Sequence, residues 1–250
     1  MTHPDHLWLH PPPRLVLTDD EVHVWRASLN LPAKHIQHLW RTLSPEEQER
    51  ARRFRFQRDR DRFIVAHGVL RAIWSRYLNV GPGELRFRFN SHGKPFLTRE
   101  FGGETLRFNM SHSHHLALYA LARNREVGID LEYIRADLAD ERIAEQFFSP
   151  REVTALRALP PEVRTEAFFN CWTRKEAYVK ARGEGLALPL DQFDVSLVPG
   201  EPARLVSTPG DPSEAARWSL RALFPGPGYV AALAVEGHAW QLKCWQWSVW

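Results

Sequence analysis

Residues 127–134 read Val127-Gly128-Ile129-Asp130-Leu131-Glu132-Tyr133-Ile134, an apolar run that carries two acids. Side chains alternate between the two faces of a β-strand, so this spacing puts both carboxylates on one face and Ile129 and Leu131 on the other. Two carboxylates on one rigid face are a natural seat for a hard cation. The stretch predicts a core strand that also presents a candidate metal site. Taken alone, such a pair is more often simply exposed to solvent.

A third acid lies in the segment Trp172-Thr173-Arg174-Lys175-Glu176-Ala177-Tyr178-Val179-Lys180, which reads as a helix. On a helix, Glu176 shares one stripe with Trp172 and Lys180, because residues four apart are neighbours. A surface ion pair between Glu176 and Lys180 is the simpler alternative, yet an aromatic, an acid and a base in succession are unusual on a solvent face. Acids from different elements, with lysines close by, are what magnesium-assisted phosphate chemistry requires.

The composition is that of an ordinary globular protein of 250 residues, with 44% hydrophobic and 25% charged residues. Apolar runs such as 116–122 are far shorter than the ~20 residues that a transmembrane helix needs. The N-terminus lacks the basic start and apolar stretch of a secretory signal, so we expect a cytoplasmic protein. Cys171 and Cys244 lie in apolar segments and are predicted to be core residues and not disulfide partners.

The sequence matches itself weakly when it is shifted by 105 positions, with Ser44-Pro45 falling on Ser149-Pro150 and Glu47 on Glu152. At both places the serine can cap a helix, the proline fits the first helical position and the glutamate favours the first turn. The shift predicts two halves with one plan, which we divide into residues 1–125 and 126–250.

Two long helices are predicted at 62–78 and 165–182, the second ended by Gly183. We expect 116–122 and 127–133 to pair as a hairpin across 123–126, and the first dozen residues to form an extended arm. The fold class is α+β, with mainly antiparallel sheets. The predicted strands are 22–25, 85–89, 106–110, 116–122, 127–133, 193–198, 218–222, 229–235 and 241–247.

Ser111 and His112 lie at a predicted tight corner between a strand and an apolar run, a place well suited to function. His112 there could donate a hydrogen bond to a phosphate oxygen. Polar turn residues are the alternative. Zinc held by His112, His114 and His115 is another, although no further His or Cys cluster stands at ligand spacing.

Seven arginines fall within residues 50–62, and Lys94 adds a cation on the predicted turn Gly93-Lys94-Pro95. The run indicates an anionic partner; a solvated helix face and nucleic-acid binding are alternatives. Because the net charge is only +3, a compact phosphate clamp fits better than a surface for duplex nucleic acid. The arginines are Arg50, Arg52, Arg53, Arg55, Arg58, Arg60 and Arg62.

Together these motifs resemble the 4′-phosphopantetheinyl transferases of the larger, Sfp-type class. The resemblance covers roughly residues 40–198 and is carried by residues 93–95, 109–113, 127–132 and 172–186. Members of this family are pseudodimers of two similar α/β halves, each a mainly antiparallel sheet packed against a long helix, and they bind coenzyme A in the cleft between the halves. The resemblance implies the same arrangement here, in a monomer.

The resemblance also assigns roles to individual residues. It implies that Mg²⁺ is held against the pyrophosphate of coenzyme A by Asp130, Glu132 and Glu176. It implies that coenzyme A is bound by Arg50, Arg62, Lys94, Ser111, His112 and Lys180, with the two arginines on the 3′-phosphate. The catalytic residues would be Glu176, Lys180 and His112, with Glu176 as the base. Two positions depart from the family pattern: Glu47 replaces a basic residue found in some relatives, and His114-His115 replace smaller residues.

The implied activity is that of a holo-[acyl-carrier-protein] synthase. The 4′-phosphopantetheine arm of coenzyme A would pass to a serine of an apo acyl, polyketide or peptidyl carrier protein, with release of 3′,5′-ADP and no nucleic-acid or membrane partner. A metal-dependent phosphodiesterase or nuclease is the alternative enzyme, and a non-enzymatic basic binding module is a third hypothesis. The shift of 105 puts Trp25 opposite Asp130 and Arg71 opposite Glu176, so we expect the metal in the second half only.

Overall fold

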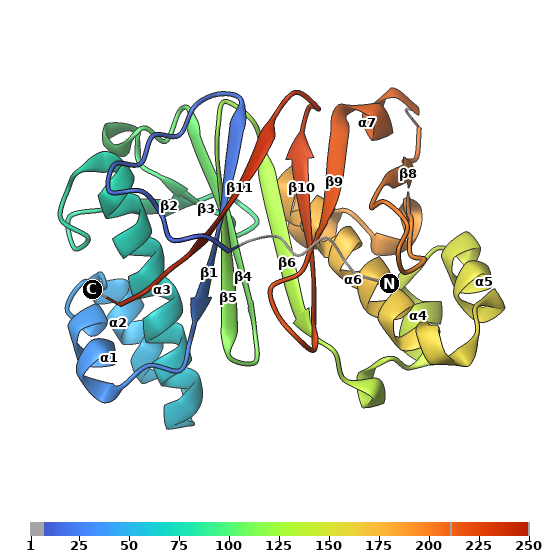
Figure 1. Ribbon diagram of the computed structural model, residues 1–250, viewed down its shortest axis with the longest axis horizontal. Coiled ribbons are helices and arrows are strands. Elements are labelled where there is room, and N and C mark those ends of the chain that lie inside the picture. Colours follow the sequence, from blue (N-terminus) through green and yellow to red (C-terminus); the bar gives the residue numbers. More distant parts are fainter. Residues whose placement is uncertain (1–7, 211, 250) are drawn as a thin grey trace.

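The computed structural model describes residues 8–210 and 212–249 and is drawn in Figure 1. The helices of this part are α1 Ala33–Trp40, α2 Pro45–Arg52, α3 Gln57–Leu78, α4 Glu141–Phe147, α5 Pro150–Ala158, α6 Pro161–Arg182 and α7 Pro212–Arg217. The strands are β1 Glu21–Ser28, β2 Phe87–Phe89, β3 Pro95–Leu97, β4 Leu106–Ser113, β5 Leu116–Arg123, β6 Val127–Tyr133, β7 Asp194–Val195, β8 Leu205–Ser207, β9 Trp218–Leu223, β10 Tyr229–Glu236 and β11 Gln241–Gln246. The predicted α+β class is confirmed.

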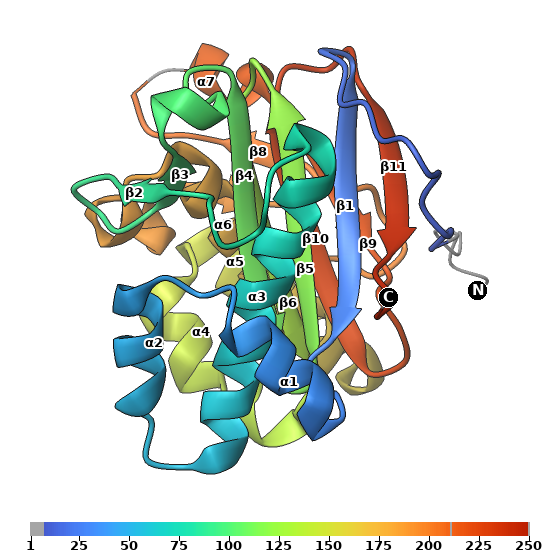
Figure 2. The ribbon, with the colours of Figure 1, turned by 90° about the vertical axis from the view of Figure 1, so that its left-hand side faces the viewer.

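The two larger sheets lie between the long helices, so that the order of layers is helix, sheet, sheet, helix (Figure 1). One sheet has the strand order β11-β1-β5-β4 and the other β6-β10-β9. Helices α1, α2 and α3 cover the outer face of the first sheet (Figure 2). Apolar side chains fill all three gaps between the layers, including Trp74 on α3, Phe169 on α6, and Val24 with Ile129 between the sheets.

Both predicted helix starts are confirmed. Ser44 accepts a hydrogen bond from the N–H of Glu47, whose side chain reaches back to the serine N–H, and Ser149 and Glu152 repeat this capping box. Each box satisfies two N–H groups that the first turn of a helix leaves without a partner. The same local chemistry therefore opens α2 and α5.

Each capping glutamate also pairs with a buried cation of the neighbouring long helix. In the first half Arg71 Nε lies 2.8 Å from Glu47 Oε2, and in the second half Lys175 Nζ lies 2.7 Å from Glu152 Oε2. Arg71 and Lys175 are almost without solvent exposure, so each glutamate supplies the opposite charge that a buried cation needs. The pairs fix the short helix of each half against the long one.

The expected match of Arg71 with Glu176 is wrong. Helices α3 and α6 have equal length and end at residues 78 and 182, which is a shift of 182 − 78 = 104 and not 105. Arg71 therefore corresponds to Lys175, and Ala72 stands where Glu176 stands. The first half lacks an acid at the position of Glu176, as expected. The residue that stands there is Ala72 and not Arg71.

Removal of the Lys175 charge should be costly. We expect Lys175→Met to lower the free energy of unfolding by about 3–5 kcal/mol, because it leaves the carboxylate of Glu152 buried without a cation. Urea denaturation would measure this, and the double variant Glu152→Gln/Lys175→Met should recover most of the loss. Arg142→Met, which breaks an exposed pair with Asp140, is the control and should cost less than about 1 kcal/mol. If Lys175→Met and Arg142→Met lowered the free energy of unfolding equally, the prediction would be contradicted.

The predicted hairpin of 116–122 with 127–133 is wrong. Strand β5 pairs antiparallel with β1 and β4, and β6 pairs antiparallel with β10 in the other sheet. Residues 117–122 are buried on both faces of β5, which is typical of a central strand. The tight turn that follows β4 contains His114 at φ 53°, so the hairpin forms there instead.

The last strand crosses between the two expected halves. Strand β11 lies in residues 126–250 but pairs in parallel with β1, with Val24 opposite Cys244. The arm that precedes β1 runs beside β11, where Leu9 bridges to Trp245. The indole of Trp8 donates to the carbonyl oxygen of Phe224 at 3.0 Å. The rest of the expected arm, residues 1–7, lies outside the described residues.

Two further expectations concern the described part of the chain. Cys171 and Cys244 are both free and buried, as predicted. Within residues 8–210 and 212–249, no helix combines the length and the apolar character that crossing a membrane demands.

Candidate functional site

Helix α6 packs unusually close to strand β6 at Gly128. A Cβ atom at this position would lie 2.1 Å from the carbonyl oxygen of Ala177 and 2.3 Å from the nitrogen of Ala181. Glycine is the only residue that leaves room for such an approach. The contact brings the acids of β6 next to the charged side chains of α6, and Lys180 Nζ lies 2.5 Å from Asp130 Oδ1.

The carboxylate of Asp130 is buried, with 3% of the residue exposed. Its Oδ1 also accepts a hydrogen bond from Ser111 Oγ at 2.9 Å, and Lys180 Nζ lies 3.3 Å from the same hydroxyl. Its Oδ2 is buried and has no hydrogen-bond partner among the described residues. A buried carboxylate oxygen without a partner is costly, so this atom is a candidate ligand for a cation.

The other two acids share the environment of Asp130. Burial raises the pKa of Glu176, and the nearby charge of Asp130 raises it further, while Lys180 lowers it. Burial, and then Asp130, also raise the pKa of Glu132. Burial lowers the pKa of Lys180, but the three acids outweigh it and the net pKa is raised. Lys180 is therefore a stable cation among three acids that repel one another.

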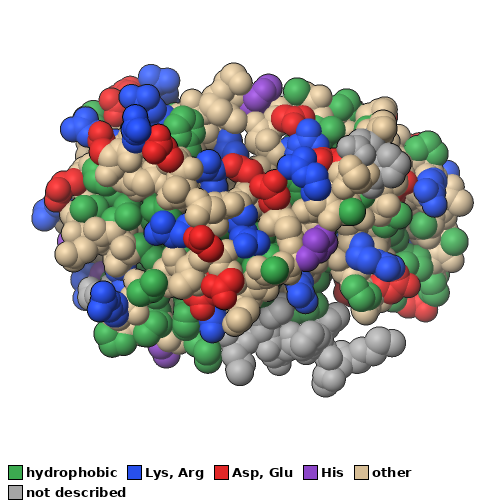
Figure 3. Space-filling view, turned by 90° about the horizontal axis from the view of Figure 1, so that it is seen from above, with side chains coloured by type: hydrophobic (Ala, Val, Ile, Leu, Met, Phe, Trp, Pro, Cys, Tyr) green, Lys and Arg blue, Asp and Glu red, His purple; other side chains and the backbone are tan. Residues whose placement is uncertain are grey.

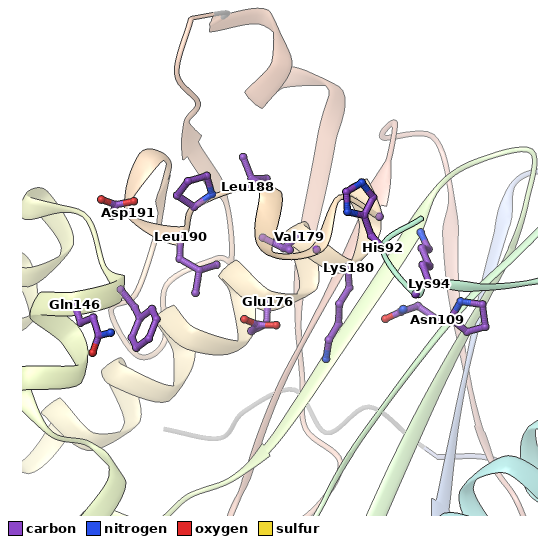
Figure 4. Close-up of a pocket in the computed structure, with 16 residues that line it drawn as sticks. His92, Lys94, Asn109, Gln146, Glu176, Val179, Lys180, Leu188, Leu190 and Asp191 are labelled. Atoms are coloured by element: carbon purple, nitrogen blue, oxygen red, sulfur yellow. The ribbon is translucent and has the colours of Figure 1, made fainter. Parts of the chain in front are cut away.

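A cavity of about 560 Å³ opens beside these side chains (Figure 4). On one side of the cavity Glu176 and Lys180 project from α6, and Gln146 projects from the end of α4. Phe147 and Leu190 also line the cavity and give it an apolar end away from Lys180. The cavity thus joins charged groups to an apolar wall, as small-molecule sites commonly do.

A second cavity, of about 1060 Å³, lies on α2 and α3 in the first half. Arg50 is on its wall, with the guanidinium 5.3 Å from the centre of the Phe63 ring. His67 lines it too, with Nδ1 3.4 Å from Glu47 Oε1. Glu47, the departure from the family pattern, is thus held by Arg71 and His67. No role was predicted for His67, although His67 follows Phe63 by one helical turn.

His112 is within electrostatic range of residues from both cavities. Burial lowers its pKa, and the neighbouring His67, Lys180 and Arg62 lower it further. The imidazole is therefore neutral at pH 7. Arg62 has a buried Nε without a hydrogen-bond partner among the described residues, so it retains donor capacity for an anion.

Lys94 lines the first cavity, but its ammonium group is already bonded. It lies 3.0 Å from Glu126 Oε2 and donates to the carbonyl oxygen of Ala181 at 2.9 Å. Asn90, in the same turn, donates to the carbonyl oxygen of Gly183 at 2.8 Å. The turn between β2 and β3 therefore caps the C-terminal end of α6.

The other two histidines that were considered as zinc ligands, His114 and His115, make aromatic contacts. His114 stacks on Tyr133 with ring centroids 4.9 Å apart, and His115 Nδ1 lies 2.9 Å from the hydroxyl of Tyr229. Neither these histidines nor the three acids form a ready-made metal group: among the residues that the structure describes, no three His, Cys, Asp or Glu side chains are so arranged.

Of the residues predicted for the site, the structure brings together Asp130, Glu132, Glu176, Lys180 and Ser111, and puts His112 and Arg62 within electrostatic range. Arg50 lies apart, in the second cavity. Three residues that matter to the geometry were missed: Gly128, His67 and Ser113. A glycine inside a strand pattern is a signal of close backbone approach and could have pointed to the first.

One buried and two half-buried carboxylates with a lysine, beside a surface that carries arginines and histidines, are typical of a protein that handles phosphate groups. Comparisons narrow this class. Residues 126–234 match the model of the 4′-phosphopantetheinyl transferase superfamily, and residues 25–124 match that of the 4′-phosphopantetheinyl transferase N-terminal domain. The chain belongs to the 4′-phosphopantetheinyl transferase superfamily, and the predicted family is confirmed.

Individual relatives agree with this assignment. The chain is 46% identical over 240 residues to the 4′-phosphopantetheinyl transferase HetI of Nostoc sp., which covers 96% of this chain and 98% of that protein. It is 33% identical over 155 residues to the 4′-phosphopantetheinyl transferase Sfp of Bacillus subtilis, or 62% of this chain and 66% of that protein. A solved structure, the holo-[acyl-carrier-protein] synthase of Thermotoga maritima, matches with a TM-score of 0.35 and 20% identity over 45% of this chain and 62% of that one.

Proposed function

We propose that this chain transfers the 4′-phosphopantetheine arm of coenzyme A to a serine of an apo acyl, polyketide or peptidyl carrier protein, with release of 3′,5′-ADP. The observation that carries the proposal is the meeting of Asp130, Glu176 and Lys180 at the contact of β6 with α6. Family membership and the long match to HetI support it. We expect the protein to act as a monomer in the cytoplasm.

We further propose that the chain is a pseudodimer of two α/β halves divided near residues 125 and 126. Three observations support this: the two capping boxes, the two 22-residue helices, and the like order of β1-β5-β4 and β6-β10-β9. In each sheet, the first strand pairs with the second strand of a later hairpin. Coenzyme A would lie between the halves, with its nucleotide on the first and its pyrophosphate on the second.

The donor chemistry of these residues fits a magnesium ion, which would bring the three carboxylates into coordination on binding. Asp130 offers a buried oxygen that finds no partner in the described part of the chain, and Glu132 and Glu176 have raised pKa values that an added positive charge would lower. All three donors are carboxylate oxygens, which hard cations prefer. We assign the binding of Mg²⁺ to these three residues. The chemistry that a bound Mg²⁺ supplies is neutralisation of charge on the phosphate oxygens.

The side chains of this chain account for the other requirements of the reaction. The oxygen of the carrier serine forms a bond to the β-phosphorus as the bond from phosphorus to the 3′,5′-ADP oxygen breaks, and the serine proton goes to Glu176. Glu176 lines the cavity and projects from a rigid helix, so it is placed to accept that proton, directly or through water. Lys180 and neutral His112 would donate hydrogen bonds to phosphate oxygens where charge develops. Lys180 is held in place by Asp130 before substrate arrives.

The nucleotide contacts are assigned to the first half. Arg62, with its unpaired Nε, and Arg50, on the larger cavity, would hold the 3′-phosphate. His67 lines the same cavity and adds a candidate contact. The hydroxyl of Ser111 is engaged with Asp130 and Lys180, so its part in the nucleotide pocket is to hold those side chains. A phosphate contact from Lys94 stays a prediction of the resemblance, because its ammonium group is bonded to Glu126.

Intact mass spectrometry tests the proposed function. The protein is incubated with coenzyme A, Mg²⁺ and a panel of apo carrier proteins, and a gain of one phosphopantetheine arm on the carrier is expected. Omission of coenzyme A or addition of a chelator should abolish the gain. No gain across the panel would reject the proposal, and cleavage of nucleic acid without coenzyme A would favour the phosphodiesterase instead.

The arginines around the α2–α3 connection should steer an acidic carrier protein. Arg53 and Arg58 are exposed there, with 77% and 71% of their side chains accessible. On the face seen from above, by contrast, basic and acidic side chains are intermixed (Figure 3). That face is at the other end of the molecule from this connection (Figure 2).

Salt dependence would reveal such steering. Raising the ionic strength from about 50 mM to about 300 mM should raise the KM for the carrier about tenfold, because salt screens exposed charges. Arg53→Ser/Arg58→Ser should raise KM at low salt and flatten the salt dependence. Arg99→Ser removes an equally exposed arginine elsewhere and should leave KM unchanged. A KM that does not respond to salt would mean that steering is unimportant.

A further inference from the structure

Strands β4 and β6 are edge strands of different sheets, yet they lie side by side (Figure 1). An edge strand presents a row of N–H groups that need partners. On this edge of β6 the partners are side chains of β4: Asn109 Oδ1, Ser111 Oγ and Ser113 Oγ. Each accepts from the N–H group twenty positions further along the chain, those of Ile129, Leu131 and Tyr133, at 2.9, 3.3 and 3.0 Å.

Two members of this side-chain ladder make a second bond. Ser111 Oγ donates to Asp130 Oδ1, and Ser113 Oγ donates to Glu132 Oε2, both at 2.9 Å. Each accepting carboxylate is the residue before the one whose N–H the serine binds. At the third position of the ladder, Asn109, the corresponding residue is Gly128, which has no side chain. The repeat therefore ties both acids of β6 to β4.

A serine hydroxyl suits this double contact, because it has one hydrogen to donate and two lone pairs to accept. Ser113 uses the hydrogen for the carboxylate of Glu132 and a lone pair for the backbone of Tyr133. The side chain and the main chain of β6 are thus fixed by one atom. The orientation of Glu132 near Asp130 and Glu176 depends on it.

We propose that Ser113 is a positioning residue, which holds the carboxylate of Glu132 in the orientation that completes the cation site. Ser113 lies in the motif 109–113, but the sequence assigns it no role of its own. The proposal rests on the proposed function only for the reaction that this site serves. Removal of a residue that orients a metal ligand or a catalytic group typically lowers metal affinity or activity 10- to 100-fold.

Three variants test the proposal. Ser113→Ala removes both hydrogen bonds, Ser113→Thr keeps the hydroxyl, and Ser113→Cys keeps the volume but is a poor donor. Ser219→Ala is the matched control, because Ser219 in β9 also accepts one bond, from Trp240, and donates one, to the carbonyl oxygen of Gly237, away from the acids. Thermal unfolding of each variant establishes that it is folded.

Two measurements on the free protein do not depend on activity. Binding of Mn²⁺ alone, followed by calorimetry, should weaken at least tenfold in Ser113→Ala and Ser113→Cys, and stay within threefold of wild type in Ser113→Thr and Ser219→Ala. Exchange of the Tyr133 amide proton, followed by NMR, should accelerate at least tenfold in Ser113→Ala only. In the transfer assay, Ser113→Ala should lower kcat 10- to 100-fold with less than threefold change in the KM for coenzyme A, and threonine should restore it.

Mn²⁺ affinity and Tyr133 exchange in Ser113→Ala that equal those of wild type would overturn the proposal. So would a wild-type protein that binds no Mn²⁺, or a loss in Ser113→Ala that threonine does not restore. Absence of transfer by the wild-type protein would reject the proposed function instead. The Mn²⁺ and amide measurements would still decide on Ser113.

Discussion

Replacement of Asp130 by asparagine is expected to lower kcat for phosphopantetheine transfer on the order of 10³-fold. The amide keeps the size of the side chain but removes the charge that holds Lys180. It also replaces a carboxylate whose buried Oδ2 has no hydrogen-bond partner among the described residues. Loss of that charge also leaves the half-buried Lys180 beside a weaker acceptor, so its position should relax. The initial rate of mass gain on an apo carrier measures the effect.

Asp137→Asn makes the same change of charge at an exposed residue outside the site and is the control. It should transfer at the wild-type rate. Asp130→Asn should also fail to bind Mn²⁺ in the absence of coenzyme A. A variant that retains more than a tenth of the wild-type kcat would show that Asp130 is dispensable, and the proposed metal site would fall with it.

Substitution of Gly128 by alanine should both destabilise the fold and disrupt the candidate site. The added Cβ meets the backbone of α6 and not a flexible side chain, with the carbonyl oxygen of Ala177 at 2.1 Å. The helix must therefore move away from β6, and we expect a loss of about 3 kcal/mol in the free energy of unfolding, with more for Gly128→Val. Any folded variant should also lose transfer activity, because Glu176 and Lys180 move with the helix.

Urea denaturation and the transfer assay together test this expectation. Gly83→Ala is the control, since a Cβ there lies 3.9 Å from the nearest atoms and the backbone has no positive φ. It should change the free energy of unfolding by less than about 0.5 kcal/mol. If Gly128→Ala were as stable and as active as Gly83→Ala, close approach of α6 to β6 would not be what assembles the site.

Local chemistry allowed several elements to be predicted from the sequence. The bounds of β6 follow from its alternating pattern, the starts of α2 and α5 follow from their capping boxes, and Gly183 ends α6 in the left-handed conformation. Long-range pairing was not predictable in this way. β5 is apolar on both faces, so its pattern indicates a central strand without naming its neighbours, and the assumption that adjacent strands pair led to the wrong hairpin.

The shorter elements were missed for similar reasons. Helices α1, α4 and α7 and strands β3 and β8 have few residues each, and their apolar positions are too few to establish a period. Within the candidate site, the grouping of Asp130, Glu176 and Lys180 was predicted from charge and spacing. The role of Ser113 was not, because a serine that bonds backbone and carboxylate looks in sequence like any polar turn residue.

The crossing of β11 to β1 has a consequence for how the chain acquires its structure. During synthesis, the edge of β1 lacks its partner until residues 241–246 have left the ribosome. Val22 and Val24, fully buried in the finished fold, lie on that open edge, and an open apolar edge is a template for aggregation. The first sheet cannot mature ahead of the second, so the two halves should fold as one cooperative unit. A fragment that stops at residue 125 is expected to be insoluble when expressed alone.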